Sequence, residues 1–408
     1  MDFDDTAEEA AWRKQCRDFL SQHAELLPKE VDLSQSYWAR PPSAAESSAY
    51  TARCRKWQRT KYDAGWAGLM WPTEYGGRGL SGHMAGIFAE EEARYNLPFG
   101  QFAQSIGMAG PTIIAHGTDD QKNKYLEPML TGEQTWCQLF SEPGAGSDLA
   151  GLRTSGVLDG DEIVVNGQKV WTSSAGEAAH GMLLVRTDVD QPKHRGISYL
   201  LLDMTTPGID VRPLKQPTGR SEFNEVFLDN VRVPLDCVLG GINRGWGPIL
   251  TTLSNERAGI GGQASYVADV IELARRFGVA ADPVVRQELA RLYSIAETMR
   301  FLGYRVRTAT SRGEQPGPES SVLKLAASRR LELMGDLSMA IMGPSATLYS
   351  SDAVFNGFWQ NYAFLGQWMS RIGGGTDQVQ RNIIGENVLG LPQEPRPDKG
   401  IPFRDIPH

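Results

Sequence analysis

The sequence predicts a fold of mixed α and β structure in three parts, and two observations carry that prediction. Apolar residues recur at helical spacing through the first third of the chain and again after residue 245. From residue 134 to about residue 240 they give way to short β-rich runs separated by Gly, Pro, Asp and Asn. Strands this short and evenly spaced favour a β-barrel or sandwich over a parallel α/β sheet. A chain of 408 residues can bury two or three such cores.

The first third is predicted to be helical. Residues 7–23 place Ala11, Cys16, Phe19 and Leu20 near helical spacing, with charged residues between them. Prolines and glycines between the later helical runs mark loops. Those further helices are predicted over residues 49–64, 83–95 and 110–129.

The middle part is predicted to consist of strands and turns. Residues 162–166 and 168–173 form two short β-rich runs on either side of Asn166-Gly167, a dipeptide typical of hairpin turns. Further strands are predicted over residues 181–187, 196–204 and 222–233.

The last part returns to helices and ends in a tail. Residues 391–408 hold five prolines, which indicates an extended segment that either drapes over a neighbouring subunit or ends in disorder. The predicted helices are residues 248–277, 283–311, 320–342 and 349–361, with a loop at 312–319.

Composition excludes several classes of function. A net charge of −8 argues against a nucleic-acid partner, which favours a basic face. The four cysteines show no paired spacing and the six histidines no cluster, so we expect no disulfide framework, no metal site and a reducing compartment. Lone histidines such as His116 and His180 are typical of structural positions. The acidic start and the absence of a long apolar run predict a cytoplasmic protein without a membrane span.

Residues 140–175 carry the clearest functional signal. Gly144 and Gly146 let the backbone approach a ligand and leave N–H groups for phosphate or ring oxygens. Hydroxyl side chains and the indole of Trp171 lie nearby in the sequence, which suits a flat cofactor that carries phosphates. Spacing alone favours an ordinary surface turn followed by a hairpin. The segment lacks the third glycine of a dinucleotide fingerprint, and the chain has no phosphate-binding P-loop.

Five segments, in order, resemble the acyl-CoA dehydrogenase family. The resemblance implies an α+β multidomain fold: an N-terminal α-helical domain (1–133), a middle β-barrel or sandwich domain (134–244), a C-terminal four-helix bundle (245–390) and a Pro-rich tail (391–408). The segments are WPTEYGG from residue 71, GTDDQKNKYLEPMLTG from 117, SEPGAGSD with NGQKVWTS from 141 and 166, NERAGIGG from 255 and IGGGTDQVQRNIIGENVLGLP from 372.

The reaction implied by this resemblance is FAD-dependent α,β-dehydrogenation of an acyl-CoA thioester to the trans-2-enoyl-CoA. A base removes the α-proton while the β-carbon passes a hydride to flavin N5, and an electron-transfer flavoprotein accepts the electrons. Many members carry the catalytic Glu immediately before the GT of the C-terminal motif, but that position here is Gly374. A minority place the base on an earlier helix, and the matching residue is Glu256. A solvated helix carboxylate is the alternative for Glu256.

The resemblance also implies binding residues. Gly374 and Gly375 open a second Gly-rich turn, whose free N–H groups at a helix start suit an anion. The FAD-binding candidates are Phe140, Ser141, Gly146, Ser147, Trp171, Thr172 and Ser173, with Thr376 and Gln378 reaching a neighbour's FAD; the substrate-binding candidates are Ser147, Ser254, Asn255 and Arg257.

Two departures from the family pattern concern assembly. The Arg that precedes the family's Phe-Gly pair is replaced by Ala274, with Arg275 and Arg276 as possible substitutes, and the family's Q-x-L-G-G run reads Ala340 to Pro344. These two departures resemble a subgroup of the family that acts in actinobacterial steroid and side-chain catabolism and can form α2β2 heterotetramers. A homodimer or homotetramer is the alternative, and Gly374 frees space for a bulky, branched or steroid-like acyl group. Rival functions are a non-catalytic partner subunit and an acyl-CoA oxidase or flavin monooxygenase.

Overall fold

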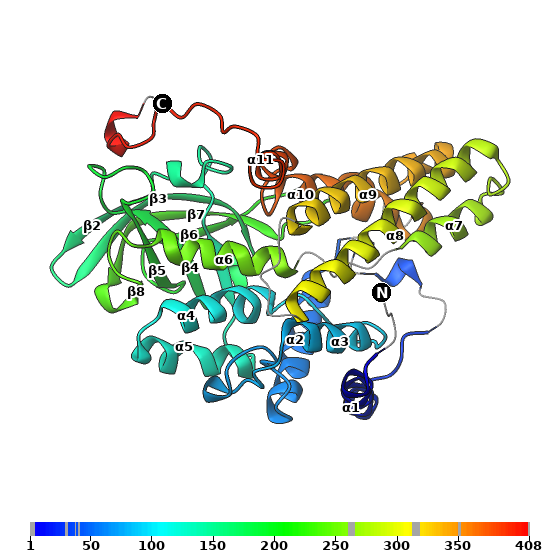
Figure 1. Ribbon diagram of the computed structural model, residues 1–408, viewed down its shortest axis with the longest axis horizontal. Coiled ribbons are helices and arrows are strands. Elements are labelled where there is room, and N and C mark those ends of the chain that lie inside the picture. The colour runs from blue at the N-terminus through cyan, green and yellow to red at the C-terminus, as the bar shows by residue number, and fades with distance from the viewer. Residues whose placement is uncertain are drawn as a thin grey trace. The chain divides into compact units, whose positions relative to one another are not determined.

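The computed structural model describes residues 5–28, 32–36, 38–39, 41–259, 266–311, 319–349 and 352–406. The predicted order of helical, β and helical parts is confirmed (Figure 1). The chain forms two compact units, which are described separately below. The helical unit comprises Met1–Tyr50, Arg78–Pro98 and Ile260–Leu391; the sheet unit comprises Thr51–Gly77, Phe99–Gly259 and Pro392–His408.

The sheet unit is built on one eight-stranded sheet. Its pairing runs in the order β6-β7-β3-β2-β4-β5-β8, and β1 pairs in parallel with β4. Both faces of the central strands are covered, since every residue of β4 and all but the last of β5 are buried. The strands are β1 (Trp136–Leu139), β2 (Ser155–Asp159), β3 (Glu162–Ser173), β4 (His180–Arg186), β5 (Ile197–Asp203), β6 (Ile209–Pro213), β7 (Phe223–Pro234) and β8 (Val238–Leu239).

The predicted hairpin turn at Asn166-Gly167 is wrong, because β3 runs through both residues as one strand of 12 residues. The ladder with β7 shifts register between Val165 and Gly167, so the dipeptide forms a β-bulge. Asn166 bonds to Asn230 of β7, whose backbone N–H donates to Asn166 Oδ1 over 2.9 Å. A Cβ at position 167 would lie 2.5 Å from Thr154 Oγ1, so glycine serves close approach to the neighbouring chain segment.

The helices of the sheet unit pack on this sheet around a shared apolar core. The predicted helix over residues 110–129 is divided in two, because Thr118 caps a new helix: its Oγ1 accepts from Gln121 N–H and Gln121 Oε1 accepts from Thr118 N–H. Ile113, Met129 and Ile249 supply fully buried side chains from three of these helices. The helices are α4 (Gly110–His116), α5 (Asp119–Thr131), α6 (Trp246–Gly259) and the part of α2 (Ala44–Asp63) that follows Tyr50.

The helical unit has its own core, centred on α9. Predicted residues 7–23 form α1 with unchanged bounds, and 283–311 form α8. The bounds are α1 (Ala7–His23), α3 (Gly82–Glu92), α7 (Val267–Arg276), α8 (Pro283–Ser311), α9 (Glu319–Met342), α10 (Gln367–Ile372) and α11 (Asp377–Asn387). Within the described helices, none is both long and apolar enough to cross a bilayer.

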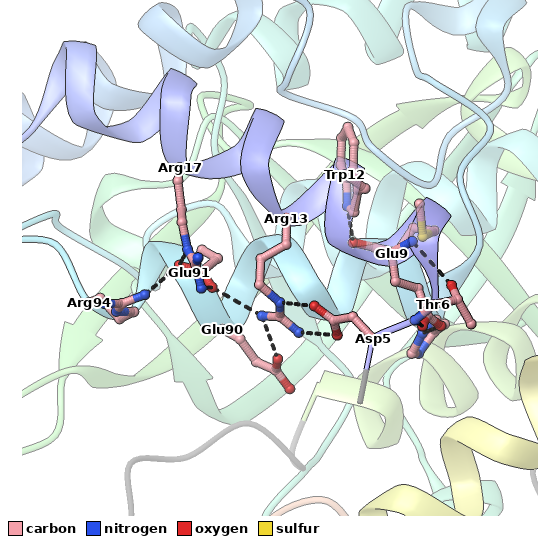
Figure 2. Close-up of polar contacts among 11 residues, drawn as sticks. Asp5, Thr6, Glu9, Trp12, Arg13, Arg17, Glu90, Glu91 and Arg94 are labelled. Atoms are coloured by element: carbon pink, nitrogen blue, oxygen red, sulfur yellow. Dashed lines mark hydrogen bonds and ion pairs between the residues drawn. The ribbon is translucent and has the colours of Figure 1, made fainter. Parts of the chain in front are cut away.

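A cluster of charged side chains joins α1 to α3 (Figure 2). Glu91 is almost fully buried and accepts hydrogen bonds from Arg13, Arg17 and Arg94 at 2.8–3.1 Å. Burial would raise the pKa of Glu91, but the three guanidinium groups lower it to about 2. Arg13 also pairs with Asp5, so the start of α1 is fixed to α3 by charge as well as by packing.

Two helix predictions in the last part are wrong in detail. The predicted helix over residues 248–277 is divided: α6 ends at Gly259 and α7 begins at Val267, with residues 260–265 outside the described part. Residues 349–361 do not form one helix either, because Phe355 and Asn356 have φ angles of 52° and 51°. The left-handed conformation of two successive non-Gly residues interrupts any α-helix there.

Candidate active site

The Gly-rich segment from Ser141 to Asp148 begins with a tight turn, and this segment is called the Gly-rich loop below. Glu142 and Ala145 exchange backbone hydrogen bonds of 3.1 and 3.0 Å around Pro143 and Gly144. A Cβ added at Gly144 or at Gly146 would meet no atom within 4 Å, so the backbone there borders open space. The loop therefore presents accessible main chain, as a ligand with phosphates requires.

The Gly-rich loop lies directly beside the end of β3. Val170 N–H donates to Ser141 O over 2.9 Å, which joins the two segments that the sequence singled out. The next residue, Trp171, has a φ of 60° and leaves 60% of its surface exposed. An exposed indole held in a conformation that costs a non-Gly residue about 1–2 kcal/mol is a feature of functional sites.

The two hydroxyls after Trp171 face different surroundings. Thr172 is fully buried and its Oγ1 has no hydrogen-bond partner within the described residues. Its carbonyl accepts from Asn224 Nδ2 over 2.9 Å. Ser173 is half-buried. Of the two predicted residues, Ser173 is therefore the more exposed.

A buried ion pair between Lys169 of β3 and Glu142 holds the Gly-rich loop against the strand. Lys169 Nζ lies 2.8 Å from Glu142 Oε1 and donates to Phe140 O over 3.2 Å. Glu142 also accepts from the backbone N–H groups of Arg153 and Thr154. Burial would raise the pKa of Glu142, but Lys169 and these hydrogen bonds lower it; burial lowers the pKa of Lys169 to about 8. The ammonium and the carboxylate therefore each favour the charged form of the other.

Helix α6 brings Glu256 into the same unit as the Gly-rich loop. Thr252 is fully buried on this helix and bonds to Thr112 Oγ1 at 2.9 Å and Tyr199 OH at 3.3 Å. Glu256 follows it by four residues, so it projects from the same face one turn later. There Gln138 Nε2 donates to Glu256 Oε2 over 3.4 Å. Because β1 ends at Leu139, the strand that contacts Glu256 leads straight into the Gly-rich loop.

The other predicted residues of the sheet unit occupy varied positions. Phe140 is buried against Tyr199, with ring centroids 5.8 Å apart, so its ring belongs to the core. Ser147 and Ser254 are exposed and Asn255 is half-buried, while the side chain of Arg257 lies outside the described part.

Thr376 and Gln378 belong to the helical unit. Thr376 caps α11, its Oγ1 accepting from Val379 N–H over 3.1 Å, and Gln378 is exposed. Gly374 and Gly375 both have positive φ, 62° and 86°. The turn is supported by Lys324, buried on α9, whose Nζ lies 3.1 Å from Asp377 Oδ1.

Arg275 and Arg276, which could replace the Arg that the family carries at position 274, both make contacts of their own. Ala274 is fully buried. Arg275 pairs with Glu272, and the Arg276 guanidinium lies 4.9 Å from the centre of the Phe355 ring. Among the residues that the structure describes, no group of three His, Cys, Asp or Glu side chains could hold a metal ion.

Comparison with known families decides the assignment. The N-terminal, middle and C-terminal domains described for acyl-CoA dehydrogenases match residues 6–133, 137–231 and 243–389. The chain belongs to the acyl-CoA dehydrogenase family. Members are flavoprotein oxidoreductases, and this enzyme retains the three-domain fold of the family.

Individual relatives cover most of the enzyme. Acyl-CoA dehydrogenase IpdE1 of Mycobacterium tuberculosis is 40% identical over 86% of this chain and 90% of its own. Acyl-CoA dehydrogenase FadE34 of the same organism is 40% identical over 89% of this chain and 50% of its own. Among solved structures, the Tcur3481-Tcur3483 steroid ACAD superposes with a TM-score of 0.80 at 31% identity over 97% of this chain and 100% of that one. The ChsE4-ChsE5 complex from M. tuberculosis gives 0.77, also at 31% identity and with the same coverage.

The residues of the sheet unit fit the flavin that the family carries. Open space over Gly144 and Gly146 leaves backbone accessible to a phosphate-bearing group, and the exposed indole of Trp171 offers a flat apolar surface beside it. Hydroxyls at Ser147 and Ser173 add donors on the accessible side.

Sequence reasoning missed the residues that support this arrangement. Gln138, Glu142 and Lys169 were not singled out, and the mixed polar and apolar residues of β3 give no local sign that Lys169 is buried. Gln138 carries no local sign either, because its contact with Glu256 joins positions 118 residues apart.

Proposed function

We propose that the enzyme removes the α- and β-hydrogens of an acyl-CoA thioester to give the trans-2-enoyl-CoA, with Glu256 as the base and FAD as the cofactor. The observation that carries this proposal is the contact between Gln138 and Glu256. It fixes a carboxylate to the strand that leads into the Gly-rich loop. The position that serves as base in many relatives is Gly374, which has no side chain to accept a proton.

The protein groups divide the work between binding and proton transfer. When bound, FAD supplies the hydride acceptor at its N5 atom. The N–H groups of the Gly-rich loop would bind its phosphates, and Trp171 and Ser173 would cover and contact its ring. The Glu256 carboxylate would take the α-proton, and desolvation of that carboxylate by the thioester would make it a stronger base. Ser147, Ser254, Asn255 and Arg257 are proposed to contact the CoA thioester, with Thr376 and Gln378 assigned to FAD contact in an assembly.

The acyl group is proposed to be bulky, branched or ring-bearing. Two features support this: Gly374 replaces a larger side chain, and a relative at 31% identity is described as a steroid ACAD. The test is to add straight-chain, branched and steroid-side-chain CoA thioesters anaerobically and follow the loss of the flavin's visible absorbance. Faster bleaching with the bulky thioesters is expected, and a clear preference for straight chains would overturn this part.

The enzyme is proposed to work as an oligomer, with an electron-transfer flavoprotein as electron acceptor. The ChsE4-ChsE5 structure is a complex of two named proteins, which supports an α2β2 assembly; a homodimer or homotetramer is the alternative. Light scattering of the purified chain together with its flavin spectrum separates them. A colourless chain that gains flavin only with a second protein indicates the heteromer, and a yellow homo-oligomer excludes it.

A further inference from the structure

We propose that the C-terminal tail, residues 392–406, is a strap that positions the Gly-rich loop for its ligand. The tail belongs to the sheet unit and touches neither Gly144 nor Gly146, so it would act through intermediate residues. The consequence for FAD rests on the proposed function, whereas the positioning itself rests on contacts within one unit.

The tail is fixed along the connection between β4 and β5 (residues 187–196; Figure 1). Phe403 N–H donates to Gln191 O over 2.9 Å, and Arg404 N–H donates to Val189 O over 3.1 Å. The Arg404 side chain adds an exposed pair with Asp190 at 2.7 Å. The prediction left open whether the tail drapes over a neighbour or is disordered; its described part packs on its own chain.

The first route from tail to loop passes through Arg186. The Phe403 ring is buried, and the Arg186 guanidinium lies 3.8 Å from its centre. Arg186 Nη2 donates to Ala150 O over 2.6 Å and to Leu152 O over 3.3 Å, while Nη1 donates to Lys193 O over 2.6 Å. The residues that follow the Gly-rich loop are thus bonded to a cation that Phe403 covers. Without the ring, water would compete for these hydrogen bonds.

The second route passes through Lys193. Its Nζ lies 2.7 Å from Asp398 Oδ2 in the tail and 3.1 Å from both carboxylate oxygens of Asp148, the last residue of the Gly-rich loop. The two carboxylates raise the pKa of Lys193 against the opposing effect of its burial. One ammonium therefore bridges the tail and the loop directly.

The first route ends on the carbonyls of Ala150 and Leu152, just after the Gly-rich loop, and the second ends on the carboxylate of Asp148, the last residue of that loop. Gly144, Gly146 and Ser147 are exposed, so the conformation of this part of the loop depends on such anchors. Holding it in place before the ligand arrives lowers the entropy lost on binding. Arg186, Lys193, Asp398 and Phe403 are thus positioning residues rather than catalytic ones.

The test measures hydrogen exchange in the chain without FAD and then FAD affinity. In Phe403→Ala, and in a chain ending at Leu391, amides of residues 141–153 should exchange roughly tenfold faster while β4 and β5 keep their protection. The FAD dissociation constant should rise roughly tenfold. Asp398→Asn, a milder change at a partly exposed site, should give a smaller effect of the same sign. Arg404→Gln, which loses only the exposed pairs with Asp190 and Asp405, is the matched control and should leave both readouts unchanged.

Unchanged exchange of residues 141–153 in Phe403→Ala and Asp398→Asn would overturn the strap. Faster exchange spread over the whole sheet unit would also overturn it, because it would show general destabilisation. The exchange readout needs neither flavin nor substrate. If the variants exchange faster in residues 141–153 but the wild-type chain reduces its FAD with no thioester, the proposed function is refuted. The positioning role of the tail then still holds.

Discussion

Gln138 of β1 and Glu256 of α6 are joined by a hydrogen bond of 3.4 Å, although 118 residues separate them in the chain. The strand continues into the Gly-rich loop and the helix is fixed to the sheet through Thr252. The candidate base is thus linked through β1 to the candidate flavin seat within the sheet unit.

Gln138→Leu should slow flavin reduction roughly threefold to tenfold, because the carboxylate loses a donor that holds it in place. FAD affinity should not change, since Gln138 has no role in the proposed flavin contacts. Stopped-flow reduction with a bleaching thioester measures the first and FAD titration the second. A variant that reduces FAD at the wild-type rate would show that the contact is incidental.

Substitutions at Thr172 and Ser173 should have different effects on stability and on FAD affinity. Thr172→Val removes a buried hydroxyl without a partner among the described residues, so the free energy of unfolding should stay level or rise by about 1 kcal/mol, with FAD affinity intact. Ser173→Ala should weaken FAD binding several-fold and leave stability unchanged. The reverse pattern, in which FAD depends on Thr172, would reject the assignment of Ser173.

Lys169→Met should destabilise the sheet unit by about 3–5 kcal/mol, because Glu142 would stay buried without the ammonium that compensates for its burial. Arg232→Met removes a cation from exposed pairs with Asp159 and Glu162 and should leave the unfolding transition unchanged. Chemical denaturation of the chain without FAD measures both. Equal transitions for the two variants would mean that the buried pair has no stabilising role.

Glu91 should make the helical unit sensitive to acid. Its pKa is about 2 in the folded chain against 4.5 ordinarily, so its contribution is complete above about pH 4.5 and is lost as the pH falls toward 2. Between about pH 4.5 and pH 3 the wild type should lose about 2 kcal/mol on this account. Glu91→Gln should start less stable and lack this part of the loss. If the free energy of unfolding falls with pH equally in the wild type and in Glu91→Gln, Glu91 is not responsible for the acid sensitivity.

The sequence predicted elements whose signals are local. Residues 7–23 form α1 as predicted because apolar spacing and the cap at Thr6 agree. The turn at Asn166-Gly167 was wrong because pairing with β7 and approach to Thr154, both distant in sequence, override the local preference. Phe403 on Arg186 lies beyond any local pattern for the same reason. Glu256 was reached through family resemblance alone, since its helical spacing fits a solvated carboxylate equally well.

The most direct test of the account compares wild type with Glu256→Gln, each loaded with FAD, during anaerobic addition of a thioester that bleaches the wild type. Glu225→Gln, the same change on β7 of the same unit, is the control and should behave as the wild type. The account predicts that Glu256→Gln keeps its flavin spectrum and affinity for FAD but shows no bleaching. Bleaching of Glu256→Gln at the wild-type rate would contradict the assignment of Glu256 as the base.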